Sequence, residues 1–113
     1  MRFNTALLHS AKLGDENTGA TLTPNYQSSA FYQPSAEQHE KLFHNKATGY
    51  SYTRINNPTI VAFEERMTNL EKGVGSVACS SGMAALTNAL LNIVGAGGDI
   101  VSSTGLYGGT IDL

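Results

Sequence analysis

A short apolar stretch that turns through Ser80-Ser81-Gly82 into a helical pattern constrains this chain more than any other feature. The segment Gly75–Cys79 is typical of a short buried strand, and the residues after Gly82 have the apolar spacing of a helix. Such a helix points unpaired backbone N–H groups, and the positive end of its dipole, past the strand. The turn therefore predicts an anion site, most simply for phosphate. The turn alone leaves open a second reading, in which a serine caps the helix and Gly82 eases the turn.

Composition narrows the class of protein. The chain has 113 residues, 41% of them hydrophobic and 14% charged, which is typical of one globular domain. A formal charge of -2 gives no reason to expect nucleic acid or an anionic membrane as partner. One cysteine, no signal-peptide pattern and no apolar run near the roughly 20 residues that cross a bilayer indicate a soluble, cytoplasmic protein.

The histidines and the glycine-rich segment predict no further ligand. His9, His39 and His44 have no ligand-like spacing among themselves or with Cys79, so we expect no metal site. We expect Cys79 to pack as a small buried hydrophobe. Residues 95–98 lack the third glycine of a dinucleotide motif and follow a helix, which predicts a loop.

The chain divides into two unlike parts near Asn57-Pro58. Residues 1–56 predict an arm with extended pieces at 21–23 and 26–32, and a helix over Ser35–Phe43 with Ser35 as its cap. Residues 57–113 predict a helix from the Asn57 cap to Gly73, a second helix over Ser81–Val94, and strands at 75–79 and 99–103. Strand, helix and strand in this order predict an α/β fold with parallel strands.

Two tyrosine segments suit a phosphate and a planar ring. If residues 50–56 are extended, Tyr52 and Arg54 project to one side, and the guanidinium fork and the phenol can both donate to a phosphate. Tyr107 lies on a glycine-flanked loop, where its ring could lie flat on a ligand ring. Taken singly, these residues are more often a surface arginine, a packed tyrosine and an ordinary loop anchor.

Together the two tyrosine segments and the Ser80-Ser81-Gly82 turn resemble one family. The order Tyr-x-Tyr-x-Arg-x-x-Asn-Pro-Thr, Ser-Ser-Gly-Met-Ala-Ala, Leu-Tyr-Gly-Gly-Thr is similar to the pyridoxal-phosphate enzymes of cysteine and methionine metabolism. Residues 18–20 and 24–29 also resemble that family's N-terminal arm. The resemblance implies a fold-type-I transferase with pyridoxal 5'-phosphate as cofactor, in which 1–56 form the arm and 57–113 the first βαβ part of the large cofactor domain.

The resemblance also implies a role for each site residue. Gly82 and Met83 would give backbone N–H groups to the cofactor phosphate beside Ser81, and Tyr107 would stack on the pyridine ring as the catalytic aromatic. Tyr52 and Arg54 would reach the phosphate held by a neighbouring subunit. This implies a homo-oligomer with a dimer as its active unit and a tetramer as its assembly.

Two family residues are expected beyond Leu113, namely the carboxylate that pairs with the pyridine nitrogen and the Schiff-base lysine. The sequence around each lysine of this chain is unlike that lysine's surroundings, which holds for Lys12, Lys41, Lys46 and Lys72. We therefore expect an N-terminal fragment that is inactive alone.

Residues 3–5 and 52–59 look most like O-acetylhomoserine sulfhydrylases, which carry out γ-replacement on a small amino acid to give homocysteine. Methionine γ-lyase and cystathionine γ-synthase activities are close alternatives within the family. A non-catalytic phosphate-binding or subunit-interaction module is an alternative from another class.

Overall fold

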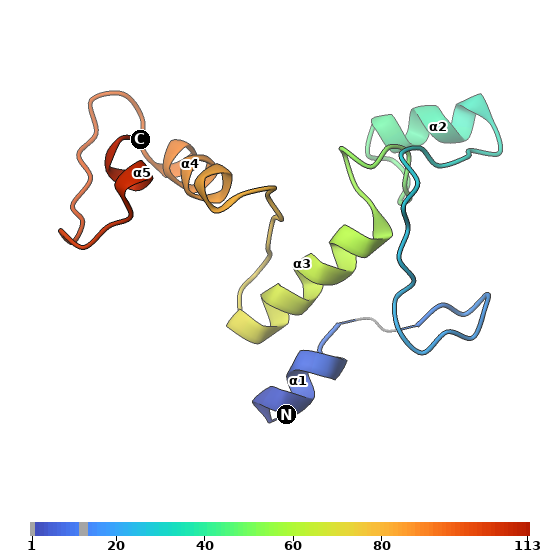
Figure 1. Cartoon of the computed structure of the whole chain (residues 1–113). Coiled ribbons are helices and arrows are strands. Elements are labelled where there is room, and N and C mark those ends of the chain that lie inside the picture. The colour runs from blue at the N-terminus through green and yellow to red at the C-terminus, as the bar shows by residue number, and fades with distance from the viewer. Residues whose placement is uncertain (1, 12–13) are drawn as a thin grey trace. The chain divides into compact units, whose positions relative to one another are not determined.

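The computed structural model describes residues 2–11 and 14–113, so the predicted context of Lys12 lies outside the described residues. The chain forms two units, one ending at Ser76 and the other beginning at Val77. Figure 1 shows helices α1 (Phe3–His9), α2 (Ala36–Phe43) and α3 (Pro58–Glu71) in the first unit, with α4 (Gly82–Ile93) and α5 (Gly108–Ile111) in the second. This division does not test the predicted boundary between arm and cofactor domain at residues 56–57, which stays a prediction.

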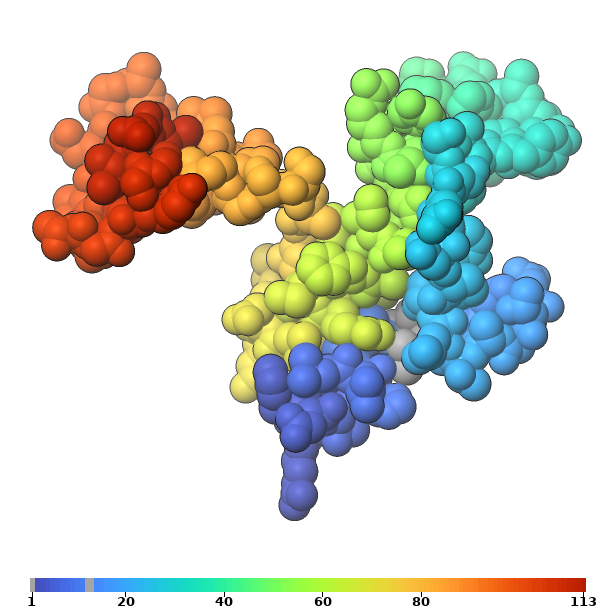
Figure 2. Space-filling view, in the orientation of Figure 1, coloured from blue at the N-terminus to red at the C-terminus, as the bar shows by residue number. Residues whose placement is uncertain are grey.

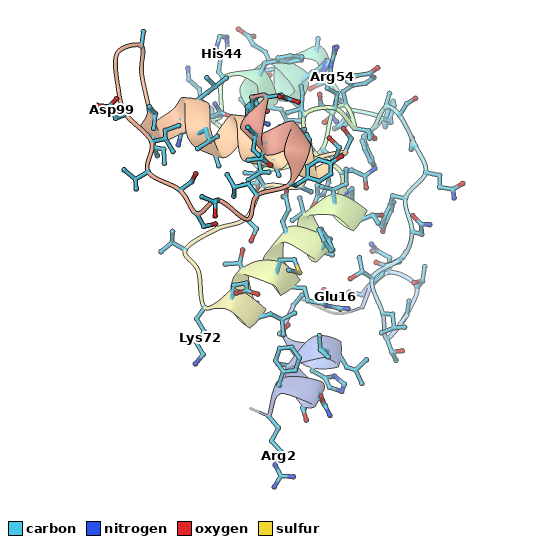
Figure 3. All side chains as sticks on the ribbon, turned by 60° about the vertical axis from the view of Figure 1, so that its left-hand side comes forward. Arg2, Glu16, His44, Arg54, Lys72 and Asp99 are labelled. Carbon is cyan, nitrogen blue, oxygen red and sulfur yellow. The ribbon has the colours of Figure 1, made fainter. Side chains whose placement is uncertain are left out.

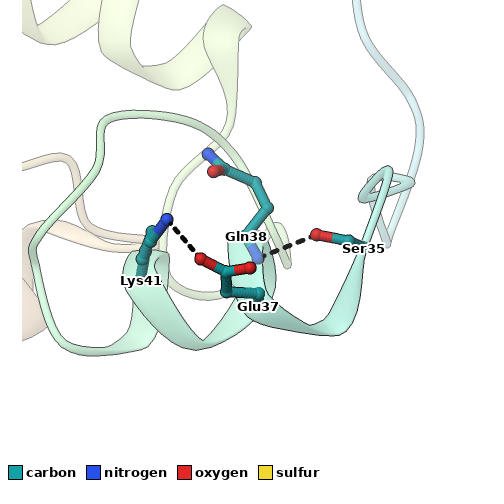
Figure 4. Close-up of polar contacts among 4 residues, drawn as sticks. All are labelled: Ser35, Glu37, Gln38 and Lys41. Carbon is teal, nitrogen blue, oxygen red and sulfur yellow. Dashed lines mark hydrogen bonds and ion pairs between the residues drawn. The ribbon is translucent and has the colours of Figure 1, made fainter.

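Helix α2 begins and ends where its sequence predicts. The Ser35 hydroxyl oxygen accepts the Gln38 backbone N–H at 3.1 Å, which satisfies one of the free donors of the first turn (Figure 4). Lys41 and Glu37 form an ion pair of 2.7 Å one turn apart, and both side chains are exposed. Such a pair adds only about 0.3–0.5 kcal/mol to a helix, so the cap does more than the ion pair to set where α2 begins.

Helix α3 confirms the prediction of a helix from the Asn57 cap to Gly73. The Asn57 side-chain oxygen accepts the Thr59 N–H at 2.8 Å, and Pro58 occupies the first helical position. The C-cap is Lys72, in the left-handed region at φ 55°, and its side chain extends away from the helix end in Figure 3. Helix α1 packs beside α3, where the Asn69 amide donates to the Ser10 carbonyl (Figures 1 and 2).

Helix α4 confirms the predicted second helix. The Ser81 hydroxyl oxygen accepts the Ala84 N–H at 3.1 Å, and Val94 is the C-cap. The short helix α5 contacts α4, with the Thr110 hydroxyl 3.9 Å from the Met83 sulfur. Neither α1 nor α5 is predicted from the sequence. Their N-cap residues, Arg2 and Tyr107, are not capping residue types, and neither makes a side-chain hydrogen bond to the helix.

The predicted strands at 75–79 and 99–103 are wrong for this structure. Within the described residues, 2–11 and 14–113, the only β pairings are two isolated antiparallel bridges. They pair Asp15 with Ala20 and Ala30 with Tyr52. The predicted extended pieces at 21–23 and 26–32 likewise form no strand. Two parallel strands from a single βαβ unit are marginal unless further strands extend the sheet, and the described residues supply none. The predicted parallel pairing is therefore not formed within this chain.

The apolar residues of the second unit are largely exposed. Val77 and Val101 of the predicted strands expose 84% and 99% of their surface, and Leu91 on α4 exposes 75%. Cys79 is only partly buried, so the prediction that it is a buried core residue is wrong. In the described part of the chain no hydrophobic side chain is fully buried, and Asn57, 3% exposed, is the only buried polar residue. The apolar spacing that predicts burial is therefore not satisfied by contacts within these residues.

Candidate functional site

The N-terminus of α4 carries free hydrogen-bond donors. Ser81 uses its side-chain oxygen for Ala84 and its carbonyl for the Ala85 N–H at 3.1 Å. The backbone N–H groups of Gly82 and Met83 have no acceptor among the described residues. Two parallel donors and the positive end of a 12-residue helix form a suitable site for an anion.

Gly82 leaves space beside these donors. A Cβ atom placed on Gly82 would meet no atom of the described residues within 4 Å, and its backbone needs no positive φ. The absence of a side chain at this position is therefore not required by packing or by backbone conformation. It does allow a ligand to approach the helix end closely.

Tyr107 lies at the start of α5, on the same unit as Met83. The residue is 74% exposed, and its carbonyl oxygen accepts the Thr110 N–H at 2.9 Å. A Cβ atom on Gly109 would lie 2.9 Å from the Tyr107 ring and 3.5 Å from the Met83 sulfur. Gly109 thus lets the ring sit where it does. The Tyr-Gly-Gly pattern is the sequence signal of this role, which was not predicted above.

Tyr52 and Arg54 meet on a turn rather than on an extended segment. The Tyr52 carbonyl accepts the N–H groups of Ile55 at 2.9 Å and of Asn56 at 3.1 Å, which closes the turn. The prediction that residues 50–56 are extended is therefore wrong, because the asparagines that follow favour a turn before the helix cap. The predicted pairing of the two side chains still holds, since the Arg54 guanidinium carbon lies 5.3 Å from the Tyr52 ring centroid.

Both members of this pair are available to a ligand. Tyr52 and Arg54, the latter labelled in Figure 3, are exposed. Across the described ranges no carboxylate forms an ion pair with Arg54. The Tyr52–Arg54 pair lies in the first unit, whereas the helix end and Tyr107 lie in the second. Their predicted meeting around one phosphate stays a prediction.

The residues that the structure describes contain no metal centre and no membrane-spanning helix. No group of three or more His, Cys, Asp or Glu side chains could hold a metal ion there. No helix in this part of the chain is both long and apolar enough to cross a membrane.

Comparisons with known proteins identify the family. The model of the Cys/Met metabolism PLP-dependent enzymes matches residues 4–113, and the chain belongs to this family. It is 48% identical over 108 residues to an O-acetyl-L-homoserine sulfhydrylase of Corynebacterium glutamicum, covering 96% of this chain and 25% of that enzyme. It is 43% identical over 110 residues to a cystathionine gamma-lyase of Bacillus subtilis, covering 97% of this chain and 27% of that enzyme.

A solved structure shares the fold. The crystal structure of an O-acetylhomoserine (thiol)-lyase from Campylobacter jejuni, which contains a pyridoxyl-lysine-phosphate, matches 98% of this chain and 27% of its own with a TM-score of 0.86 and 31% identity. The chain thus spans about a quarter of the length of the proteins it matches.

The residues present fit the family's cofactor. Pyridoxal phosphate has a phosphate dianion and a flat aromatic ring, and the α4 end combines two free N–H donors with open space at Gly82. The exposed Tyr107 ring lies on the same unit, near Met83, as a surface on which such a ring can stack.

Proposed function

We propose that these residues supply the arm and the phosphate-binding part of an O-acetylhomoserine sulfhydrylase that forms homocysteine from O-acetylhomoserine and sulfide. The 48% identity to the Corynebacterium glutamicum enzyme is the observation that carries this choice. The free donors at the start of α4 support a phosphate site in this chain. Residues of the protein outside these 113 would supply the Schiff-base lysine and the carboxylate for the pyridine nitrogen.

Each site residue has a defined task in this proposal. Gly82 and Met83 hold the cofactor phosphate through backbone N–H groups, and Ser81 orients them by capping the first turn. Tyr107 stacks on the pyridine ring and keeps it in one plane. The bound cofactor supplies the electron sink for chemistry at the amino-acid substrate.

Tyr52 and Arg54 complete the phosphate site across a subunit boundary. Both side chains are exposed and have no acidic partner in the described residues, so they are free to reach a second subunit. The guanidinium adds a charge-assisted hydrogen bond, about twice as strong as a neutral one. The active unit in this proposal is a dimer, assembled into a tetramer.

Substrate assays on the full-length enzyme test the reaction. O-Acetylhomoserine with sulfide is expected to yield homocysteine and acetate. If the enzyme turns over only methionine, giving a keto acid, ammonia and a thiol, its activity is that of a γ-lyase and the proposed sulfhydrylase activity is wrong. The 43% identity to the Bacillus subtilis cystathionine gamma-lyase makes γ-elimination the second candidate, so cystathionine belongs in the same assay.

A non-catalytic module is tested separately. The coding sequence past Leu113 is expected to continue into an aspartate and a Ser-x-x-Lys-like segment. A stop codon directly after Leu113 would favour a phosphate-binding or subunit-interaction module instead.

A further inference from the structure

Asn57 lies at the centre of a hydrogen-bond network that its role as a helix cap does not explain. Its side-chain oxygen accepts the Thr59 N–H at 2.8 Å, which is the cap. Its side-chain nitrogen donates to the Tyr26 carbonyl at 3.0 Å and to the Thr53 hydroxyl oxygen at 3.1 Å. With only 3% of its surface exposed, Asn57 has no water to replace these contacts.

Thr53 connects this network to the Tyr52–Arg54 pair. It stands between the two in sequence, and its N–H donates to the Ser29 carbonyl at 2.9 Å while its hydroxyl donates to the Ser28 carbonyl. Its hydroxyl oxygen accepts from Asn57 as well. The residue between Tyr52 and Arg54 is thus held by backbone and side chain together, whereas the pair itself is exposed.

The same network joins two distant stretches of chain. Thr59 on the first turn of α3 accepts the Tyr26 N–H at 2.8 Å and donates to the Pro24 carbonyl at 3.4 Å. Figure 1 shows this earlier segment passing beside the start of α3. Asn57 and Thr59 therefore fix Pro24 and Tyr26 to the start of the helix, and residues 28–29, a little further along the same segment, hold Thr53.

We propose that Asn57 is a positioning residue for phosphate recognition, which acts by holding Thr53 and thereby the turn that presents Tyr52 and Arg54. The proposal rests on the phosphate role of that pair in the proposed function. A binding group must be held by a rigid supporting shell to reach a ligand in one geometry. The amide nitrogen of Asn57 supplies that support, while its oxygen caps α3.

The variant Asn57→Ser separates the two roles in the full-length enzyme. Serine is as good an N-cap as asparagine, but its short side chain cannot reach both Tyr26 and Thr53. Ser35→Ala is the matched control, because it removes a helix cap on α2 whose hydrogen bond goes to Gln38 and not to the Tyr52–Arg54 turn. Thr53→Val, which removes the hydroxyl and keeps the shape, serves as a second probe if Asn57→Ser does not fold.

The measurement is the apparent dissociation constant of pyridoxal phosphate, obtained by titrating the apoenzyme, together with the ³¹P chemical shift of the bound phosphate. We expect Asn57→Ser to weaken binding by about tenfold and to move the ³¹P signal, since two supporting hydrogen bonds are lost. Ser35→Ala should leave both readouts unchanged. In a Tyr52→Phe/Arg54→Ala background, which lacks both donors, Asn57→Ser should weaken binding no further, since it acts only through this pair.

Three results would overturn the proposal. An equal loss of cofactor affinity from Asn57→Ser in the unmodified enzyme and in the Tyr52→Phe/Arg54→Ala background would show a merely structural role. If Arg54→Ala lowers the affinity for pyridoxal phosphate and Asn57→Ser does not, the positioning role is refuted and the proposed function remains intact. Unchanged affinity in Arg54→Ala would refute the phosphate role of the pair, and this inference with it, whereas homocysteine formation would still test the reaction independently.

Discussion

The guanidinium carbon of Arg54 lies 5.3 Å from the centroid of the Tyr52 ring, on a turn where both side chains are exposed. A cation over an aromatic face at an exposed site is worth roughly 0.5–1 kcal/mol, which is enough to favour one arrangement of the two side chains. The N–H groups of the guanidinium remain free for an anion. The pair is therefore suited to present two donors together to a phosphate.

Replacing Arg54 should weaken cofactor binding, by an amount that depends on the replacing residue. Arg54→Ala removes a charge-assisted hydrogen bond of roughly 1.5–3 kcal/mol, so the dissociation constant of pyridoxal phosphate should rise about ten- to a hundredfold. Arg54→Lys keeps the charge but loses the planar fork, and its effect should be intermediate. Arg2→Ala removes another exposed arginine as a control for net charge, and titration of each apoenzyme measures the outcome. Equal cofactor affinities for all three variants would show that Arg54 does not bind the phosphate.

A side chain at Gly82 should exclude the phosphate without unfolding the protein. A Cβ there meets no atom within 4 Å in the part of the chain that the structure describes, so Gly82→Val should change the melting temperature little while it greatly weakens cofactor binding. Gly95→Val is the matched control, because that position is equally open and lies in the loop after α4. Unchanged cofactor affinity in Gly82→Val would refute the assignment of the α4 turn.

Gly109 should control the position of the Tyr107 ring. The Cβ of Gly109→Ala would come within 2.9 Å of the ring, which must then move, whereas Gly108→Ala has open space. We expect only the first variant to change the visible absorption band of the bound cofactor and to lower its affinity. Identical spectra for the two variants would indicate that Tyr107 does not stack on the cofactor.

Asp15 should titrate below the usual aspartate range. The Thr18 hydroxyl donates to its carboxylate at 2.8 Å and the Asn17 N–H at 3.1 Å, and these bonds lower the pKa of Asp15. Because the pKa is lower in the folded protein, the turn over residues 15–20 gains stability above the unfolded-state pKa. That gain is lost as the pH falls through the folded-state pKa. A ¹³C NMR titration of the Asp15 carboxyl should show this, and Thr18→Val should raise the pKa toward its ordinary value.

The helices with side-chain caps are the part of the fold that local sequence predicts. Ser35, Asn57 and Ser81 each accept a backbone N–H at the start of the helix that they predict. Such caps depend on residues two or three positions apart, which a sequence displays directly. Helix α1 follows Arg2, which makes no cap bond, so it had no such signal and forms where it packs on α3.

The strands and the turn at residues 52–55 depend on partners that local sequence does not reveal. The apolar pattern of 75–79 and 99–103 indicates burial, but a β-strand also needs a neighbouring strand, which the described residues do not provide. Alternation at residues 50–56 favours an extended segment, whereas Thr53 bonds to Ser28 and Ser29, 25 and 24 positions earlier. The hydrogen bond from the Asn57 amide to the Tyr26 carbonyl also joins residues far apart in sequence, so local sequence did not predict it.

A shared active site is the central claim, and complementation between two subunits with weakened cofactor binding tests it most directly, assayed at a pyridoxal phosphate concentration too low to load either variant alone. Full-length Arg54→Ala and Gly82→Val chains, co-expressed with different tags and purified as hybrids, combine one intact helix end with one intact arm. If Arg54 serves the phosphate held by the neighbouring subunit, the hybrid regains one complete site, and homocysteine formation should return to about half or less of the unmodified rate. If hybrids form and no activity returns, Arg54 acts within its own subunit and the claim of a shared site is contradicted.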